Sequence, residues 1–116
     1  MAKKKRKKKS ARLDADQQPQ ELTGVMRLLV EIPAAKLDLH GLTALQAEAR
    51  LRDFMRTEST RSAGQVVHIV TGRGTRSQGA AVLPGIAQDL LRGDLADFVK
   101  EMAGLPGGGA LAVRLR

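Results

Sequence analysis

The feature that most constrains the fold is the run VVHIV at residues 66–70, which is almost wholly apolar and β-branched. A run of this length and composition is typical of a strand that is buried on both faces. Such a strand belongs in the middle of a sheet, so we predict a central strand here. His68, which alternates into this buried run, is expected to be a satisfied core histidine.

The segments on either side predict alternating strands and helices. A strand is expected at about residues 36–40, followed by a helix that begins with a capping box at Thr43 and Gln46 and runs to about Glu58. Four residues form the buried stripe of this helix: Ala47, Leu51, Phe54 and Met55. A second helix is marked by Val82, Leu83, Ile86, Leu90 and Leu91, and Pro84 is tolerable there only in the first turn.

The chain closes with two further strands. The first is expected at about residues 97–102, and a glycine-rich turn at 104–109 joins it to an alternating strand in which Leu111, Val113 and Leu115 share one face. The order β-α-β-α-β-β predicts an α/β fold, a two-layer α/β sandwich. The first two strands should be parallel, the last two should form an antiparallel hairpin, and the four-stranded mixed sheet should carry both helices on one face.

Charge separates the N-terminal segment from the rest. Eight of the 20 lysine and arginine residues lie between residues 3 and 12 with no acid among them, which leaves 12 cations against 12 acidic residues in the remainder. We expect residues 1–20 to be a disordered basic arm, 21–33 an adorning helix with a linker, and 34–116 the folded domain. The adorning helix should bury Leu22, Val25, Met26 and Leu29. The candidate nucleic-acid contacts in the arm are Lys3, Lys4, Lys5, Arg6, Lys7, Lys8 and Lys9.

The residue types that are missing exclude several kinds of reaction and binding. There is no cysteine, which removes disulfides, thiol nucleophiles and Cys-ligated zinc. No apolar run is long enough for a membrane span or a signal peptide, so we expect a cytoplasmic protein without a membrane partner. Tryptophan and tyrosine are missing, and only Phe54 and Phe98 supply rings. Contacts to backbone phosphate are therefore favoured over base stacking.

The run LDLHG at residues 37–41 displays an acid and an imidazole together, because Asp38 and His40 alternate onto one strand face and Gly41 ends the strand. Two residues of separation do not by themselves establish that the carboxylate orients the ring. Three roles are open: His40 as general base or acid, Asp38 positioning a hydroxyl or holding His40 through a bridging group, or both helping to bind a divalent ion. The structural alternative is that Asp38 caps the Gly41 turn and His40 bonds to backbone.

A glycine-containing loop follows the central strand. In TGRG at residues 71–74, Gly72 and Gly74 leave backbone N–H groups unobstructed, while Arg73 and Arg76 add charge for a phosphate. The loop matches neither a dinucleotide fingerprint nor a Walker A loop, because Ser77 occupies the third glycine position and no Gly-Lys-Ser or Gly-Lys-Thr closes it. Both runs fall at the carboxyl ends of parallel strands, where ligands gather. A shared site is therefore predicted.

Taken together, LDLHGLT, HIVTGRG and GGGALAVRL resemble the Smr (small MutS-related) domain, whose hallmarks are an LDxH motif and a TGxG or HGxG motif. The resemblance covers roughly residues 36–116 and implies a free-standing member with a fold similar to the C-terminal domain of translation initiation factor three. It also implies an endonuclease-type domain whose relatives nick DNA or cleave RNA, including messenger RNA on ribosomes. By matched position, Asp38 and His40 would be the catalytic pair, and Gly72 and Gly74 the phosphate-side loop, with Arg73 at the variable position.

RNA is the favoured substrate. Its 2′-hydroxyl would attack the adjacent phosphorus with His40 in proton transfer, Asp38 positioning, and the glycine loop with Arg73 or Arg76 stabilising the charge, which requires no metal or cofactor. DNA nicking would need an activated water and a bound Mg²⁺. The competing hypothesis is a non-enzymatic RNA-, ribosome- or DNA-binding module tethered by the lysine-rich arm. The sequence does not fix the oligomeric state.

Overall fold

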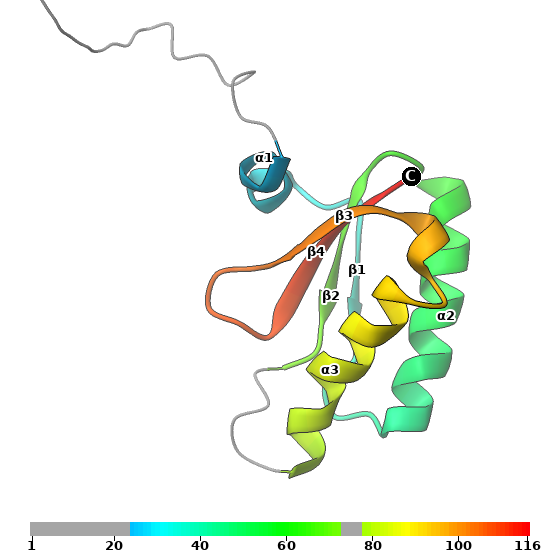
Figure 1. Cartoon of the computed structure of the whole chain (residues 1–116), viewed down its shortest axis with the longest axis vertical. Helices are drawn as coiled ribbons and strands as arrows, with labels where there is room; N and C mark the ends of the chain where they lie inside the picture. Colours follow the sequence, from blue (N-terminus) through cyan, green and yellow to red (C-terminus); the bar gives the residue numbers. More distant parts are fainter. Residues whose placement is uncertain (1–23, 73–77) are drawn as a thin grey trace, which may run out of the picture.

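The computed structural model describes residues 24–72 and 78–116. The basic arm expected at residues 1–20 lies outside these residues. The chain order of the elements is shown in Figure 1: α1 (Gly24–Val30), β1 (Ala35–Asp38), α2 (Ala44–Arg61), β2 (Val66–Val70), α3 (Gln78–Arg92), the 3₁₀ helix η2 (Ala96–Phe98), β3 (Val99–Gly104) and β4 (Ala110–Leu115).

The four strands form one mixed sheet in the order β1-β2-β4-β3. β1 pairs with β2 in parallel, whereas β4 is antiparallel to both β2 and β3. This arrangement confirms the predicted parallel pair, the closing hairpin and the central place of β2. Ile69 pairs with Leu37 on one side and Leu111 on the other, which continues the apolar face across three strands.

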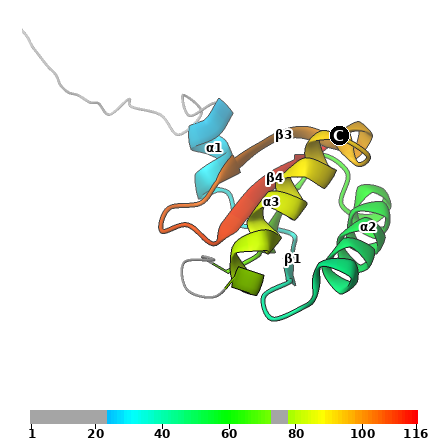
Figure 2. The same ribbon diagram turned by 60° about the horizontal axis from the view of Figure 1, so that its bottom comes forward.

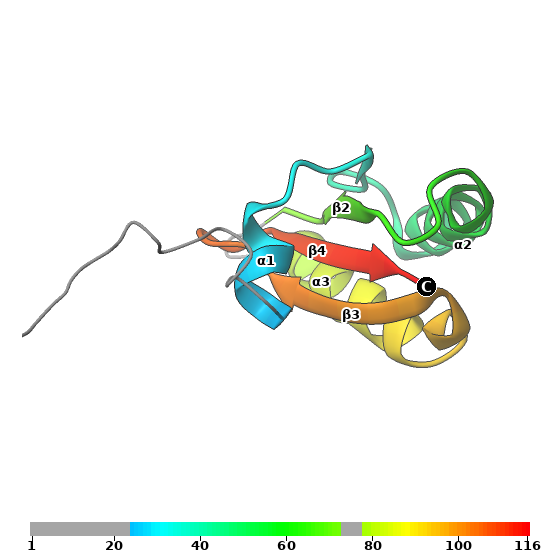
Figure 3. The ribbon, with the colours of Figure 1, turned by 90° about the horizontal axis from the view of Figure 1, so that it is seen from above.

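Helices α2 and α3 cover the same face of the sheet, as predicted (Figures 2 and 3). The capping box of α2 is present, because the Thr43 hydroxyl accepts from the Gln46 N–H and the Gln46 side chain accepts from the Thr43 N–H. The two helices and this sheet face enclose the main core. Its members include Leu39, Ala47, Leu51, Met55, Val67, Ile69, Leu83, Ala87, Leu91, Val113 and Leu115.

Several element boundaries differ from the predicted ones. β1 ends at Asp38 rather than residue 40, because a side-chain-capped turn begins there. α2 continues to Arg61, where its last turn is extended by the buried Glu58, which accepts from the Ser62 hydroxyl at 2.8 Å. β3 starts at Val99, two residues later than predicted, because residues 96–98 form η2.

The second helix was predicted to start close to Pro84, and this was wrong. α3 begins at Gln78, so Pro84 is its seventh residue and lies beyond the first turn. A proline in this place removes one backbone hydrogen bond and crowds the carbonyl four residues earlier. The buried residues that follow it, Ala87 and Leu91, are both almost fully inaccessible and keep the helix on the sheet. Val82, also expected in the stripe, is 48% exposed.

Helix α1 packs on the opposite face of the sheet (Figure 3). Its one buried residue, Leu28, contacts Val66 and Ala112. The predicted stripe was on the wrong side, since Val25 and Met26 are each 55% exposed. Leu28 instead packs against Val66 and Ala112 of the sheet, a contact between distant residues that local periodicity does not encode. In the described part of the chain, no helix has the length and apolar character that crossing a membrane requires.

Candidate functional site

The acid–imidazole pair lies at the carboxyl end of β1. The last parallel hydrogen bond joins the Leu39 N–H to the Val70 carbonyl at 2.7 Å, after which the chain turns through Gly41, whose φ is +85°. Leu37 and Leu39 pack on the core, so Asp38, the last residue of β1, lies on the face of the sheet opposite α2 and α3. His40 follows in the turn, so the two residues are not displayed by one strand as predicted but meet where the strand ends.

The carboxylate of Asp38 makes two bonds to the same residue. Oδ1 accepts from the His40 backbone N–H at 3.0 Å and contacts the His40 ring Nδ1 at 2.8 Å. The first bond is the turn cap that formed part of the structural alternative. The second shows that the carboxylate orients the ring directly, without a bridging group, so two residues of separation are sufficient. Among residues 24–72 and 78–116, the His40 ring makes no hydrogen bond to a backbone group, whereas that alternative expected one.

The hydrogen bonds to Asp38 favour the ionised form of its carboxyl group. The hydrogen bond from the His40 ring, followed by the one from the His40 N–H, lowers the pKa of Asp38 below its usual value. Because an ionised carboxylate only accepts hydrogen bonds, the proton of the neutral ring resides on Nδ1 and leaves Nε2 unprotonated. The His40 side chain is 70% exposed. Nε2 can therefore take a proton from a group that arrives from solvent.

Gly72 lies beside this pair at the end of β2. Its φ is +81°, and a Cβ added to it would lie 3.5 Å from the Cβ of His40. The Gly72 N–H was expected to be free for a phosphate, but it donates to the Gly109 carbonyl at 3.0 Å. Gly72 thus contributes a left-handed turn and close approach to His40 rather than an open donor.

The Gly109 carbonyl also holds Thr71, a contact that the sequence analysis missed. It accepts from the Thr71 N–H at 2.8 Å and from the Thr71 hydroxyl at 3.4 Å, and Thr71 is only 3% exposed. Gly109 ends a turn in which Gly107, Gly108 and Gly109 all have positive φ. The three-glycine run was the available signal, because consecutive left-handed residues place a carbonyl where an ordinary turn does not.

The remaining site predictions fall outside the described residues. Arg73, Gly74 and Arg76, and the arm residues Lys3 to Lys9, are in this group. Across residues 24–72 and 78–116, no cluster of three His, Asp or Glu side chains is arranged to hold a metal ion.

His68 differs from the satisfied core histidine that was predicted. Its Nε2 is buried without a hydrogen-bond partner among the described residues. Burial, followed by the charge of Lys36, lowers the pKa of His68 below 6.5 and favours the neutral ring. Lys36 pairs with His68 in the register of β1 and β2, on the same face as Asp38. The second histidine is thus close in the sheet to the first but is not part of the pair.

Fold and site together define a small α/β domain with an acid–imidazole pair at the carboxyl edge of two parallel strands. The sequence model of the Smr domain matches residues 37–116, so the chain belongs to the Smr domain family. This confirms the family that the three motifs predicted. Smr domains are associated with nuclease activity and with nucleic-acid interaction. The similarity to translation initiation factor three stays a prediction.

Two individual proteins resemble the chain. An uncharacterized protein of Treponema pallidum (strain Nichols) is 40% identical over 60 residues, which is 52% of this chain and 29% of that protein. The chain therefore spans less than a third of the length of this curated relative. The crystal structure of the human small-MutS related domain superposes with a TM-score of 0.49 and 26% identity, over 69% of this chain and 99% of the human one.

Proposed function

We propose that this chain is an RNA endonuclease in which His40 is the general base. The observation that supports the proposal is the 2.8 Å contact between Asp38 Oδ1 and His40 Nδ1 on an exposed ring, because in the neutral tautomer that donates to Asp38 the Nε2 atom is the free acceptor. An imidazole held in one tautomer by a carboxylate is the arrangement that general base catalysis uses. Asp38 acts through His40, so its role is positioning.

The proposed reaction is a transesterification. Nε2 of His40 accepts the proton of the 2′-hydroxyl, the 2′-oxygen forms a bond to phosphorus, and the bond from phosphorus to the 5′-oxygen breaks. The leaving 5′-oxygen takes a proton from solvent or from the His40 imidazolium. The products are a 2′,3′-cyclic phosphate and a 5′-hydroxyl end. Nothing in this sequence of bond changes requires a metal or another cofactor.

The glycine loop and the arm have supporting roles in this proposal. Arg73 and Arg76 would neutralise the charge that develops on the phosphorane. Because the Gly72 N–H is occupied by Gly109, the backbone donor of the loop would be the Gly74 amide. The cations of residues 3–9 would add affinity for RNA, including ribosomal RNA, that falls steeply with salt.

One observation favours the alternative of a non-enzymatic nucleic-acid-binding module. The His40 and Asp38 side chains are 70% and 53% exposed, whereas electrostatic catalysis is strongest where water is excluded. In this alternative the pair caps a turn and the binding surface supplies the function.

The test is cleavage of end-labelled single-stranded RNA and of supercoiled plasmid by the full chain, with magnesium or with chelator. The His40→Ala variant is compared with His68→Leu, which removes the other imidazole of the chain. Chelator-resistant cleavage to cyclic-phosphate ends, lost only in His40→Ala, supports the proposal. Metal-dependent nicking with 3′-hydroxyl ends would refute it and make Asp38 a metal ligand. Binding without cleavage at high protein concentration would establish the alternative.

A further inference from the structure

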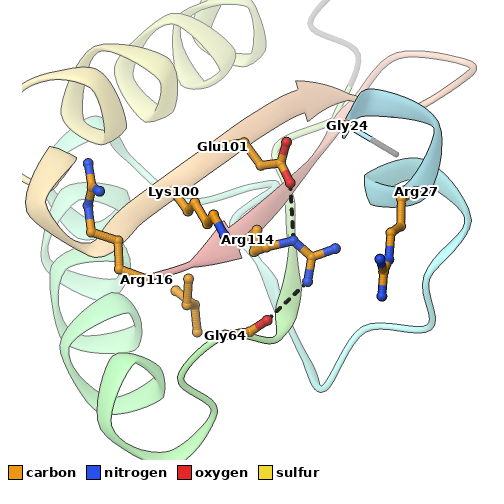
Figure 4. A pocket seen from close by; sticks show the side chains of 8 residues that line it. Gly24, Arg27, Gly64, Lys100, Glu101, Arg114 and Arg116 are labelled. Atoms are coloured by element: carbon orange, nitrogen blue, oxygen red, sulfur yellow. Dashed lines mark hydrogen bonds and ion pairs between the residues drawn. The ribbon is translucent and has the colours of Figure 1, made fainter. Parts of the chain in front are cut away.

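A pocket lined by basic residues lies at the other end of the sheet from the acid–imidazole pair. The pocket has a volume of about 350 Å³ and is lined by residues from α1, the turn before β2, β3 and β4 (Figure 4). Four of its eight lining residues are cationic and one is acidic, giving a formal charge of +3. These residues are Gly24, Arg27, Gly64, Lys100, Glu101, Arg114, Leu115 and Arg116.

Arg114 is the least exposed cation of this pocket, and its guanidinium is already hydrogen-bonded to groups of the protein. Its Nε donates to Glu101 at 3.1 Å, and its two terminal nitrogens donate to Glu31 at 2.7 and 3.5 Å and to the Gly64 carbonyl at 3.0 Å. These contacts use most of the five donors of the guanidinium. Figure 4 shows the bonds from Arg114 to Glu101 and Gly64, with Lys100 and Arg116 to the left of Arg114 and Arg27 to its right. Arg114 therefore fixes the geometry and holds both nearby carboxylates, while its single charge balances one of them.

The other three cations remain available to a ligand. Arg27, Lys100 and Arg116 are exposed, and within the described ranges the ion pairs at this pocket all involve Arg114. Arg114 balances one of the carboxylates of Glu31 and Glu101, so the four cations exceed the two acids by two charges. A group that accepts several hydrogen bonds and carries negative charge is the complement of such a surface.

The pocket shares a sheet face with Asp38 of the acid–imidazole pair. Arg114 and Glu101 pair in the row of Val66, whereas Asp38 pairs with Val70 at the other end of β2. Four residues along a strand span about 13 Å, and the two strand spacings from β1 to β4 span about 10 Å across the sheet, so Asp38 and Arg114 are separated by about 16 Å. A nucleic-acid strand of about five nucleotides covers this distance even at the 3.4 Å axial spacing of stacked bases.

We propose that the pocket of Arg27, Lys100 and Arg116 binds a backbone phosphate of the same RNA strand whose reacting bond lies at His40. The inference rests on the proposed function for the identity of the polyanion. An acidic peptide is the competing ligand. Phosphate is favoured because the cations exceed the carboxylates by two charges and because arginine forks match phosphate oxygens in a bidentate manner. The second contact would set the direction and register of the strand on the sheet.

The experiment follows backbone amide shifts by NMR while a 12-nucleotide oligo(U) RNA is added to the full chain. The protein carries His40→Ala, so that the RNA stays intact. The test variant adds Arg27→Gln and Lys100→Gln, and a matched control adds Arg50→Gln and Arg56→Gln, two exposed arginines of α2. A poly-glutamate peptide of equal charge is titrated in parallel. The shifts of Leu51 and Val113, both buried, report whether each variant is folded.

The expected result is RNA-dependent shifts at Gly64, Glu101 and Leu115 in the control and their loss in the test variant. RNA affinity should fall about three- to tenfold in the test variant, and the salt slope by about 1.4, because two phosphate contacts are lost. Absence of these shifts, their persistence in the test variant, or equal shifts with poly-glutamate would overturn the proposal. Failure of RNA cleavage by the wild-type chain would leave these readouts unaffected, so the two proposals fail separately.

Discussion

Replacing Arg114 with methionine tests whether one buried arginine holds α1 on the sheet. The Arg114 side chain is 13% exposed and joins Glu31, which follows α1, to Glu101 on β3. Methionine fills similar space without donors. The variant leaves two carboxylates that are 27% and 33% exposed, and a Gly64 carbonyl without its donor.

The expected loss follows from these exposures. A hydrogen bond to a charged group contributes about 1.5–3 kcal/mol, and breaking a fully buried ion pair costs about 3–5 kcal/mol. The carboxylates of Glu31 and Glu101 can regain part of their hydration, so we expect a destabilisation of roughly 2–4 kcal/mol. For a domain of this size, that corresponds to a Tm lower by roughly 10–25 °C.

The assay is thermal unfolding of the full chain at pH 7, followed by circular dichroism. Arg52→Met is the control, because Arg52 pairs with Asp94 at 3.0 Å while 36% exposed, and its loss should cost less than about 1 kcal/mol. Adding Glu31→Gln and Glu101→Gln to Arg114→Met should restore at least half of the lost Tm, since no charge is then left unpaired. Equal effects of Arg114→Met and Arg52→Met, or no rescue, would refute the reasoning.

The same contact predicts how stability depends on pH. The hydrogen bond from Arg114 is the main cause that lowers the pKa of Glu31 below its ordinary value of 4.5. A carboxyl whose folded pKa is depressed contributes stability that is fully present above the unfolded value and is lost as pH falls through the folded value. Below about pH 4.5, the free energy of unfolding should therefore fall less steeply in Arg114→Met than in the wild type.

Three further variants address the site and the sheet. Asp38→Asn keeps an oxygen for the turn but not the ionised partner of Nδ1, so RNA cleavage should fall by roughly 10²-fold or more with little change in Tm; an unchanged rate would show that the carboxylate does not orient the ring. Gly72→Ala should lose about 1–2 kcal/mol in urea unfolding because of its φ of +81°, and an unaffected midpoint would contradict the need for glycine. His68→Leu should be as stable as the wild type or more so at pH 7, and should lack the wild-type loss of stability as pH falls below 6.5, where protonation of a ring with a lowered pKa opposes folding.

Much of the fold was predictable because the decisive signals are local. The β-branched composition of residues 66–70 identified the central strand, and the spacing of Thr43 and Gln46 identified the start of α2. The alternation of Leu111, Val113 and Leu115 identified the last strand, and all three are buried. Each of these patterns depends on residues within a few positions of one another, so each survives any reasonable tertiary arrangement.

The features that were missed depend on contacts between distant residues. Arg114 meets Glu31 across 83 positions, and Thr71 meets Gly109 across 38. The face that α1 buries packs against Val66 and Ala112, a contact that no pattern within residues 24–30 encodes. At the candidate site, the sequence identified Asp38 and His40 but not their direct bond, because turn geometry rather than strand alternation brings the ring to the carboxylate.

Charge balance in the folded part of the chain conceals an uneven distribution. Because cations and acids are equal in number from residue 13 onward, the basic composition by itself supported polyanion binding for the N-terminal segment alone. In space, however, one pocket gathers Arg27, Lys100, Arg114 and Arg116 on the sheet face of Asp38. Another, between α2 and α3, gathers Glu48, Asp89 and Asp94, of which Asp94 is paired with Arg52. Phosphate is attracted to the first and repelled by the second, so a nearly neutral domain can still orient a nucleic-acid strand on one face.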